Sequence, residues 1–271
     1  MLQFIQYIFL DLKNPFHFKL VYFFEKIIKY PVVIINRYFK MNFPLPYLLK
    51  KDFVIHNSDG KWLIKARSWD DYSIAVPNEQ DLREYFFELE SWIFLDIWSH
   101  IWKWPITLSG KNTHITSYCF EPNPTTFTYL TESVKLNKLE DRMFCYNVWI
   151  GNESWVLNFE AHSQSAFSKF IEAPIEWSLK VEVIQIDDFI RNENVPFDQI
   201  KLIKIDTEWF EFKVIEWMKN LLQNSSENLK IICEILPVQK DKDAIIEYLS
   251  SFWFQYKILE TKQDYYFYKK K

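Results

Sequence analysis

Glycine is almost missing from this chain of 271 residues, which contains 3 of them. Average usage of about 7% would give roughly 19. Glycine reaches positive φ angles, and lets backbone approach a ligand, without a steric cost. Tryptophan is in excess, with 12 residues, and aromatic residues make up 19% of the chain. Other residue types must therefore occupy the turns and close approaches that glycine normally serves.

Cysteine, paired histidines and long apolar runs are scarce as well. Cys119, Cys145 and Cys233 share no short spacing, which excludes a metal knuckle or a disulfide framework and favours the reduced thiols of a cytoplasmic protein. The histidines show no paired spacing, which argues against zinc. The carboxylates Asp206, Glu208 and Glu211 have a spacing that could hold a divalent cation, but no independent ligand signal supports it, and we expect no metal. The apolar start MLQFIQYIFL ends at Asp11 after about ten residues, too short to span a bilayer, and no signal-cleavage site follows. We predict neither a secretory signal nor a transmembrane helix.

The charge is unevenly distributed along the chain. The formal net charge is −4, which gives no general footprint for nucleic acid. Residues 1–51 carry eight Lys and Arg against Asp11 and Glu25, whereas the remainder has 24 basic and 34 acidic residues. Prolines break this basic, aromatic segment, which predicts two or three short helices. Such helices suit either the cytoplasmic face of an anionic membrane or packing on their own domain.

The pattern of apolar residues predicts three parts. Residues 1–51 form the helical extension, residues 52–90 a small β-meander with a linking helix, and residues 91–271 an α/β domain. In the last part, apolar strands separated by helices indicate a parallel sheet covered on both faces. Residues 155–187 are predicted to form an inserted hairpin, and the last two strands an antiparallel pair. The strands are expected at 93–97, 115–120, 143–148, 200–205, 229–235 and 254–259, and helices at 124–136, 210–222 and 241–252.

Five motifs follow one another at the predicted strand ends. They are FLDIWSHIW, FEPNP with LNKL after it, VIQIDDFI, IKLIKIDTEWFEFKVIEWM and KIICEI. In order and spacing, over about residues 90–260, the series resembles the FkbM family of S-adenosylmethionine-dependent methyltransferases. The resemblance implies a class I, Rossmann-like fold: a doubly wound, mostly parallel seven-stranded sheet with an antiparallel last strand. It also implies methyl transfer from S-adenosylmethionine to a hydroxyl of a sugar, glycan or related metabolite.

Tryptophan stands where the family pattern has glycine. The diagnostic positions are Trp98, Trp102, Trp209 and Trp217, and softer glycine preferences coincide with Trp92, Trp149, Trp155 and Trp253. We hypothesise that these are UGA codons that the source organism reads as glycine. TGG codons at the four diagnostic positions would contradict this. The alternative is a catalytically dead pseudo-methyltransferase, a binding protein in which real tryptophans fill the cofactor cleft.

Ligands of doubly wound sheets bind at the carboxyl ends of the strands, which locates the expected cofactor residues. Glu121 ends the second strand and is expected to accept both ribose hydroxyls. Asp96 ends the first strand and is expected to orient the loop or meet the amino group of the cofactor. Asn123 either supports the same pocket or caps a helix, and Asn147 is expected near the adenine. The loop after the first strand supplies the remaining candidates: Trp98, Ser99, His100 and Trp102.

Three carboxylates after the fourth strand are the expected catalytic residues. Methyl transfer is an in-line displacement that requires removal of the acceptor's hydroxyl proton, which a desolvated carboxylate can accept. Asp206 is the first candidate for this base and Glu208 the second. Glu211 begins the next helix, where it either takes part or compensates the helix dipole.

A nucleotide-using dehydrogenase is the remaining rival, since an acidic residue after the second strand is common to both classes. The loop has the spacing D-x-W-x-x-x-W. This does not become G-x-G-x-x-G even with glycine at both tryptophans, which disfavours a dinucleotide site.

Overall fold

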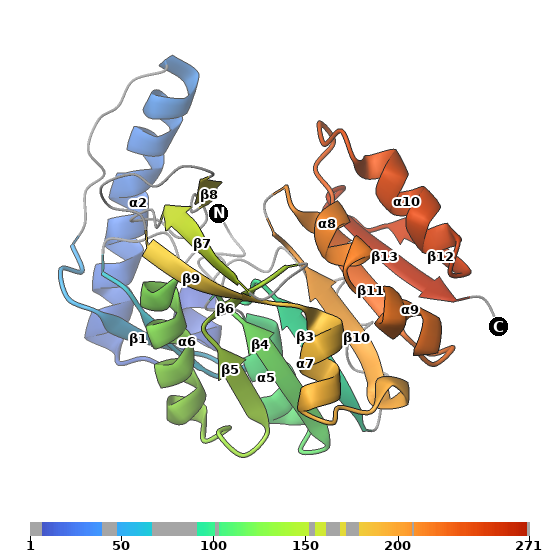
Figure 1. Ribbon diagram of the computed structural model, residues 1–271. Coiled ribbons are helices and arrows are strands. Elements are labelled where there is room, and N and C mark those ends of the chain that lie inside the picture. Colours follow the sequence, from blue (N-terminus) through green and yellow to red (C-terminus); the bar gives the residue numbers. More distant parts are fainter. Residues whose placement is uncertain are drawn as a thin grey trace.

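A seven-stranded sheet forms the centre of the computed structural model, which describes residues 7–39, 48–66, 91–100, 103–151, 155–160, 169–171, 179–207 and 209–269. The strand order is β12-β13-β11-β10-β3-β4-β5 (Figure 1). The bounds are β3 Trp92–Ile97, β4 Ile115–Phe120, β5 Met143–Tyr146, β10 Ile200–Ile205, β11 Lys230–Glu234, β12 Phe254–Ile258 and β13 Asp264–Lys269.

The direction of the strands confirms the predicted class I methyltransferase architecture. β3 lies at the centre, where it pairs in parallel with β4 and β10, and the parallel pairing continues to β5 and β11. β13 runs antiparallel to both β11 and β12, between which it is inserted. All six residues of β3 are buried, as an apolar strand covered on both faces requires.

Helices cover both faces of the sheet. One face packs against α7 (Ile186–Asn192), α8 (Glu211–Glu216), α9 (Lys219–Asn224) and α10 (Lys242–Ser250), and α5 (Lys103–Lys111) packs on the other. The helix α6 (Pro124–Asn137) follows β4 as predicted.

The single helix predicted over 210–222 is wrong, because the chain forms α8 and α9 there instead. The buried Asp187 carboxylate accepts hydrogen bonds from the backbone N–H groups of Asn220 and Leu221, each at 2.9 Å. These bonds satisfy amide groups that a new helix start would otherwise leave unpaired. A long-range contact therefore fixes the break.

The predicted insert is larger than a hairpin. A separate sheet has the order β6-β9-β7-β8, with β6 Val148–Ile150, β7 Trp155–Glu160, β8 Lys169–Ile171 and β9 Leu179–Ile184. The strand predicted over 143–148 therefore divides at Asn147 between the two sheets. The Asn147 amide donates to the carbonyls of Glu121 and Pro122 at 2.8 and 3.1 Å, which holds the chain where it leaves the central sheet.

The N-terminal part contains a π-helical turn, η1 (Tyr7–Asp11), the 24-residue helix α2 (Phe16–Phe39), and an antiparallel hairpin of β1 (Phe53–His56) with β2 (Lys61–Ile64). The prediction of two or three short helices is wrong for α2, which continues through Pro31. Proline removes one helical hydrogen bond, but its fixed φ fits a helix. The rest of the predicted meander and its linking helix lie outside the described residues. No helix in the described ranges is long and apolar enough to cross a bilayer.

Candidate functional site

The loop after β3 is held against the end of β4 by backbone hydrogen bonds. The Ser99 hydroxyl donates to the Asp96 carbonyl at 2.8 Å, and the Ser99 amide donates to the Phe120 carbonyl at 2.8 Å. The next amide, that of His100, donates to Glu121 Oε2 at 2.7 Å. Ser99 therefore shapes the loop, and His100 presents its backbone to the predicted ribose-binding carboxylate.

Glu121 is fully buried at the tip of β4. Its Oε1 accepts the Asn123 amide at 2.8 Å. Burial raises the pKa of Glu121 to about 7, against the opposing effects of His100 and the two amide donors. The Asn123 side chain accepts the amides of Thr125 and Thr126 at 3.0 and 3.3 Å and so caps α6. Both expected roles of Asn123 are therefore present, because its side chain caps the helix and its backbone supports Glu121.

Asp96 is the least satisfied polar group of the site. Its side chain is fully buried, and within the described part of the chain neither carboxylate oxygen has a hydrogen-bond partner. Burial raises its pKa to about 7, although Lys204, opposite it in the β3–β10 register, favours the charged form. A buried polar group without a partner is costly. A ligand ammonium such as that of S-adenosylmethionine would supply the missing donors, so these carboxylates fit the expected cofactor.

Replacing Asp96 by asparagine is expected to stabilise the ligand-free chain by about 2 to 4 kcal/mol near pH 8 and to have little effect near pH 4. The reason is that the native pKa of about 7 lies above the ordinary 3.8, so the folded state is penalised as the pH rises through this interval. Urea unfolding at several pH values measures the difference. Asp141→Asn, at a side chain that is 71% exposed, is the control. A loss of stability at high pH would contradict the assignment.

A second buried group lies at the ends of β10 and β11. The Lys204 ammonium lies 2.7 Å from Asp206 Oδ2, and both side chains are largely buried. Glu234, at the end of β11, is hydrogen-bonded to Asp206. The Asp206 charge, followed by burial, raises the pKa of Glu234 to about 10. Burial alone would raise the pKa of Asp206, but Lys204 and Glu234 hold it below its ordinary value. Asp206, Glu234 and Lys204 therefore titrate as one group, in which Lys204 favours the ionised form of Asp206 and the Asp206 charge disfavours ionisation of Glu234.

Glu211 has a different environment from Asp206. Its Oε1 accepts the Thr207 amide and hydroxyl at 2.8 and 3.0 Å and the Trp209 amide at 3.3 Å, and its Oε2 accepts the Gln239 amide at 2.7 Å. Burial raises the pKa of Glu211. These bonds make Glu211 a positioning residue for the loop after β10. Glu208 and Trp102, the other expected site residues near these loops, lie outside the described residues.

Sequence reasoning missed Lys204, Glu234 and Gln239. The first two stand inside the motifs IKLIKID and KIICEI, at the ends of adjacent strands, which is the signal that could have identified them. Among the residues that the structure describes, no three His, Cys, Asp or Glu side chains are arranged to hold a metal ion.

Three of the tryptophans at family glycine positions have the backbone conformation that glycine favours. Their φ angles are 66° at Trp98, 88° at Trp209 and 64° at Trp253. A bulky residue at positive φ is a genuine outlier, whereas glycine adopts this region freely. Trp217, at φ −82°, imposes no such requirement. Positive φ also occurs at His100, Lys138, Asn194 and Lys262, so these angles do not identify the natural residue, and the UGA hypothesis stays a prediction about the gene.

The Trp98 indole belongs to an aromatic cluster beside the site. Its ring meets that of Trp149 edge-on at 5.0 Å, and Trp149 meets Phe210 at 5.6 Å. Val181 and Val183 complete this cluster, in which Trp98 is 6% exposed. A large apolar group thus occupies the turn between Asp96 and the amides that bind Glu121.

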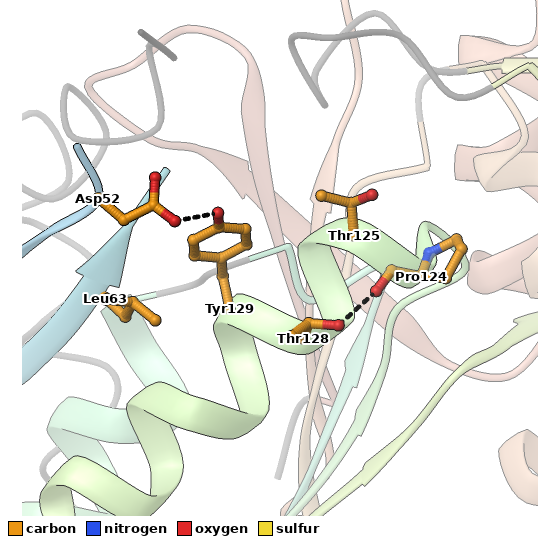
Figure 2. Close-up of a pocket in the computed structure, with 6 residues that line it drawn as sticks. All are labelled: Asp52, Leu63, Pro124, Thr125, Thr128 and Tyr129. Carbon is orange, nitrogen blue, oxygen red and sulfur yellow. Dashed lines mark hydrogen bonds between the residues drawn. The ribbon is translucent and has the colours of Figure 1, made fainter. Parts of the chain in front are cut away.

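A separate hollow of about 390 Å³ lies at the start of α6. Figure 2 shows its lining residues, with the Tyr129 hydroxyl donating to Asp52 at 2.5 Å. The lining consists of Asp52, Leu63, Pro124, Thr125, Thr128 and Tyr129. None of the described residues predicted for the cofactor or for catalysis lines it, so it is distinct from the site above.

Comparison with known proteins places these motifs in a family. The profile of the methyltransferase FkbM domain matches residues 85–256. A segment of 113 residues is 27% identical to the hexuronic acid methyltransferase AglP of Haloferax volcanii, covering 42% of this chain and 45% of that protein. The chain therefore spans less than half the length of that relative.

Solved structures of other methyltransferases are similar at a lower level. TYW2 of M. jannaschii, solved in complex with AdoMet, has a TM-score of 0.46 and 14% identity, covering 84% of this chain and 90% of that one. The precorrin-6y C5,15-methyltransferase of Geobacter metallireducens has a TM-score of 0.45 and 9% identity, covering 70% and 87%.

Proposed function

Because the chain belongs to the FkbM methyltransferase family, we propose that it transfers a methyl group from S-adenosylmethionine, the methyl donor of that family, to a hydroxyl oxygen of a sugar, glycan or related metabolite. The observation that carries this proposal is the buried pair of Asp206 and Glu234 at the carboxyl edge of the sheet. One member of the pair is ionised, so it can accept the proton of a hydroxyl group.

Two carboxylates at neighbouring strand ends would hold the cofactor. Glu121 would accept hydrogen bonds from the ribose hydroxyls, either in place of those from the backbone amides or in addition to them. Asp96 would accept hydrogen bonds from the ammonium group of the cofactor. Asp96 is the penultimate residue of β3 and Glu121 follows the last residue of β4, and because these strands are parallel neighbours, both residues lie at the carboxyl edge of the sheet.

When bound, the cofactor would supply an electrophilic methyl group on a sulfonium sulfur, and breaking of the methyl–sulfur bond would leave S-adenosylhomocysteine as the neutral thioether product. The chain must hold the acceptor oxygen in line with that methyl group and take up its proton. Asp206 is the proposed base, and its carboxylate receives the hydroxyl proton as the new O–C bond forms. Lys204 keeps Asp206 ionised until that step, and the Glu234 proton remains on its hydrogen bond with Asp206.

The proposed base favours a hydroxyl group over a carboxylate as the position of methylation. A carboxylate is already ionised and needs no base, whereas a hydroxyl group needs one. The relative AglP is named for hexuronic acids, which carry both groups. A hexuronic acid or a glycan that contains it is therefore a sensible first acceptor, with a hydroxyl as the expected position.

Methyl transfer from tritiated S-adenosylmethionine to neutral sugars, glycans and hexuronic acids tests the proposal. The expected product is a methyl ether, whose label survives mild alkali. A label released by mild alkali would identify a methyl ester and overturn the assignment of a hydroxyl acceptor. Transfer to none of these acceptors, by protein shown to bind the cofactor, would overturn the acceptor class.

Glu121→Gln is expected to weaken the binding of S-adenosylmethionine by about tenfold or more near pH 8, because a charged acceptor of two hydrogen bonds is lost. The loss should shrink near pH 6, since the pKa of Glu121 is about 7 and the group is then largely protonated. Calorimetric titration measures the affinity near pH 8 and near pH 6. The chain used also carries Trp98→Gly, so that the indole does not limit binding. Glu132→Gln, on the surface of α6, is the control. Equal affinities for Glu121→Gln and its parent would refute the ribose assignment.

A further inference from the structure

One face of α2 is anchored to the rest of the protein. Tyr22 is fully buried, and Phe18 packs against the ring of Phe53 in β1 at 5.6 Å. Glu25 and Lys29 form a buried ion pair at 2.7 Å, and the same carboxylate accepts the amides of residues 48 and 49 at 2.7 and 2.6 Å. The orientation of the helix about its own axis is therefore fixed.

The opposite face of α2 is apolar and exposed. Large apolar side chains recur there every three or four residues along the helix, so they fall on one side of it. Phe24 is 53% exposed and Tyr38 is 77% exposed. We name this face the α2 stripe, and it consists of Val21, Phe24, Ile27, Ile28, Ile34, Ile35 and Tyr38. A contiguous apolar surface of this length marks an interaction site.

The charges around the α2 stripe are predominantly basic. Residues 7–39 contain five Lys and Arg and two acidic residues, and the buried pair of Glu25 and Lys29 removes one charge of each sign from the surface. Lys19 and Lys26 fall on the helix between the stripe and the buried face, where Lys19 Nζ donates to the Phe9 carbonyl at 3.4 Å and Lys26 Nζ lies 4.9 Å from the centre of the Tyr22 ring. In Figure 1 the far end of α2, which carries the later residues of the stripe, projects beyond the body of the protein. A protruding apolar face bordered by lysines is complementary to a lipid surface with anionic headgroups.

We propose that the α2 stripe docks on an anionic lipid surface, with α2 lying in the plane of the interface. The aromatic and aliphatic side chains enter the boundary between headgroups and acyl chains, and Lys19 and Lys26 face the headgroup phosphates. The charged residues within α2 suit a helix that lies on the surface.

Sedimentation with vesicles tests this proposal on the full chain. The parent protein is expected to pellet with vesicles of equal parts phosphatidylglycerol and phosphatidylcholine, and to pellet less at high salt or with phosphatidylcholine alone. The double variant Phe24→Ser, Ile28→Ser is expected to lower the partition coefficient by at least about tenfold, because it removes apolar area from the stripe. Val238→Ser, at an apolar side chain that is 76% exposed on another part of the surface, is the matched control and should pellet like the parent.

Three outcomes would overturn the proposal. The first is the absence of pelleting by the parent, and the second is equal pelleting by parent and stripe variant. The third is a dimer in sedimentation velocity that the stripe variant dissociates, which would make a second copy of the chain the partner. Circular dichroism of the variants establishes that they are folded, and binding of S-adenosylmethionine should be the same in parent and variants.

Discussion

Trp98→Gly is expected to raise the affinity for S-adenosylmethionine by about tenfold or more. The reason is steric, because the indole leaves the turn between Asp96 and the amides that bind Glu121, and a buried tryptophan side chain accounts for roughly 150 to 250 Å² of surface. Relief of the backbone strain at φ 66°, about 1 to 3 kcal/mol, stabilises the free and the bound chain alike and does not itself change the affinity. Calorimetric titration of the parent and the variant measures the change.

Trp253→Gly is the matched control for this prediction. Trp253 has a similar φ of 64°, but it lies after α10 and is 81% exposed, away from the predicted cofactor residues. Both variants relieve a positive φ, yet only Trp98→Gly should change cofactor affinity. Equal affinities for Trp98→Gly and the parent would refute the steric role of the indole. Sequencing the gene is the independent test of whether codon 98 is UGA or TGG.

Asp206→Asn is expected to lower kcat by about 10² to 10⁴, because the acceptor hydroxyl loses its base while the shape of the site is retained. The affinity for S-adenosylmethionine should change little. The measurement is single-turnover methyl transfer at saturating cofactor, in a chain that carries Trp98→Gly. An Asp206→Asn chain that retains the parental rate would remove Asp206 from the chemistry.

Glu234→Gln separates the two members of the acid pair. Glutamine resembles the protonated carboxyl group that the pKa of about 10 implies, and it can still donate to Asp206. We expect a loss of rate much smaller than that of Asp206→Asn, because the Asp206 carboxylate is retained. The pH profile of the rate should shift, because Glu234 no longer titrates together with Asp206. A loss as large as that of Asp206→Asn would show that the proton of Glu234 is itself transferred.

Much of the central domain could be predicted from the sequence. The strands β3, β4, β10 and β11 appear as runs rich in apolar residues because both faces of the sheet are covered, and carboxylates lie at or just after their ends. Asp96, Glu121 and Asp206 were therefore found at the strand tips. α6 was found because Asn123 and Pro124 provide the local signals of a helix start.

Other features depended on contacts between distant residues. The break between α8 and α9 is stabilised by Asp187 from another helix, and the division of the third strand by the Asn147 amide. The passage of α2 through Pro31 accompanies the anchoring of its buried face on β1. The pattern of neighbouring residues in the sequence does not reveal these contacts, because the residues that make them are far apart along the chain.

The sequence by itself determined the order of the strands along the chain, because burial on both faces of a parallel sheet leaves runs of apolar residues. Its five motifs, with carboxylates at the strand ends, carried the resemblance to the family. The scarcity of glycine was also visible there, as tryptophans at family glycine positions. Only the tertiary structure decided which of those tryptophans require positive φ, that Glu234 and Lys204 complete the site of Asp206, and that Glu211 is engaged in holding a loop. These properties depend on backbone angles, on burial and on charges brought together from separate strands, since a carboxylate's pKa is set by its neighbours in space.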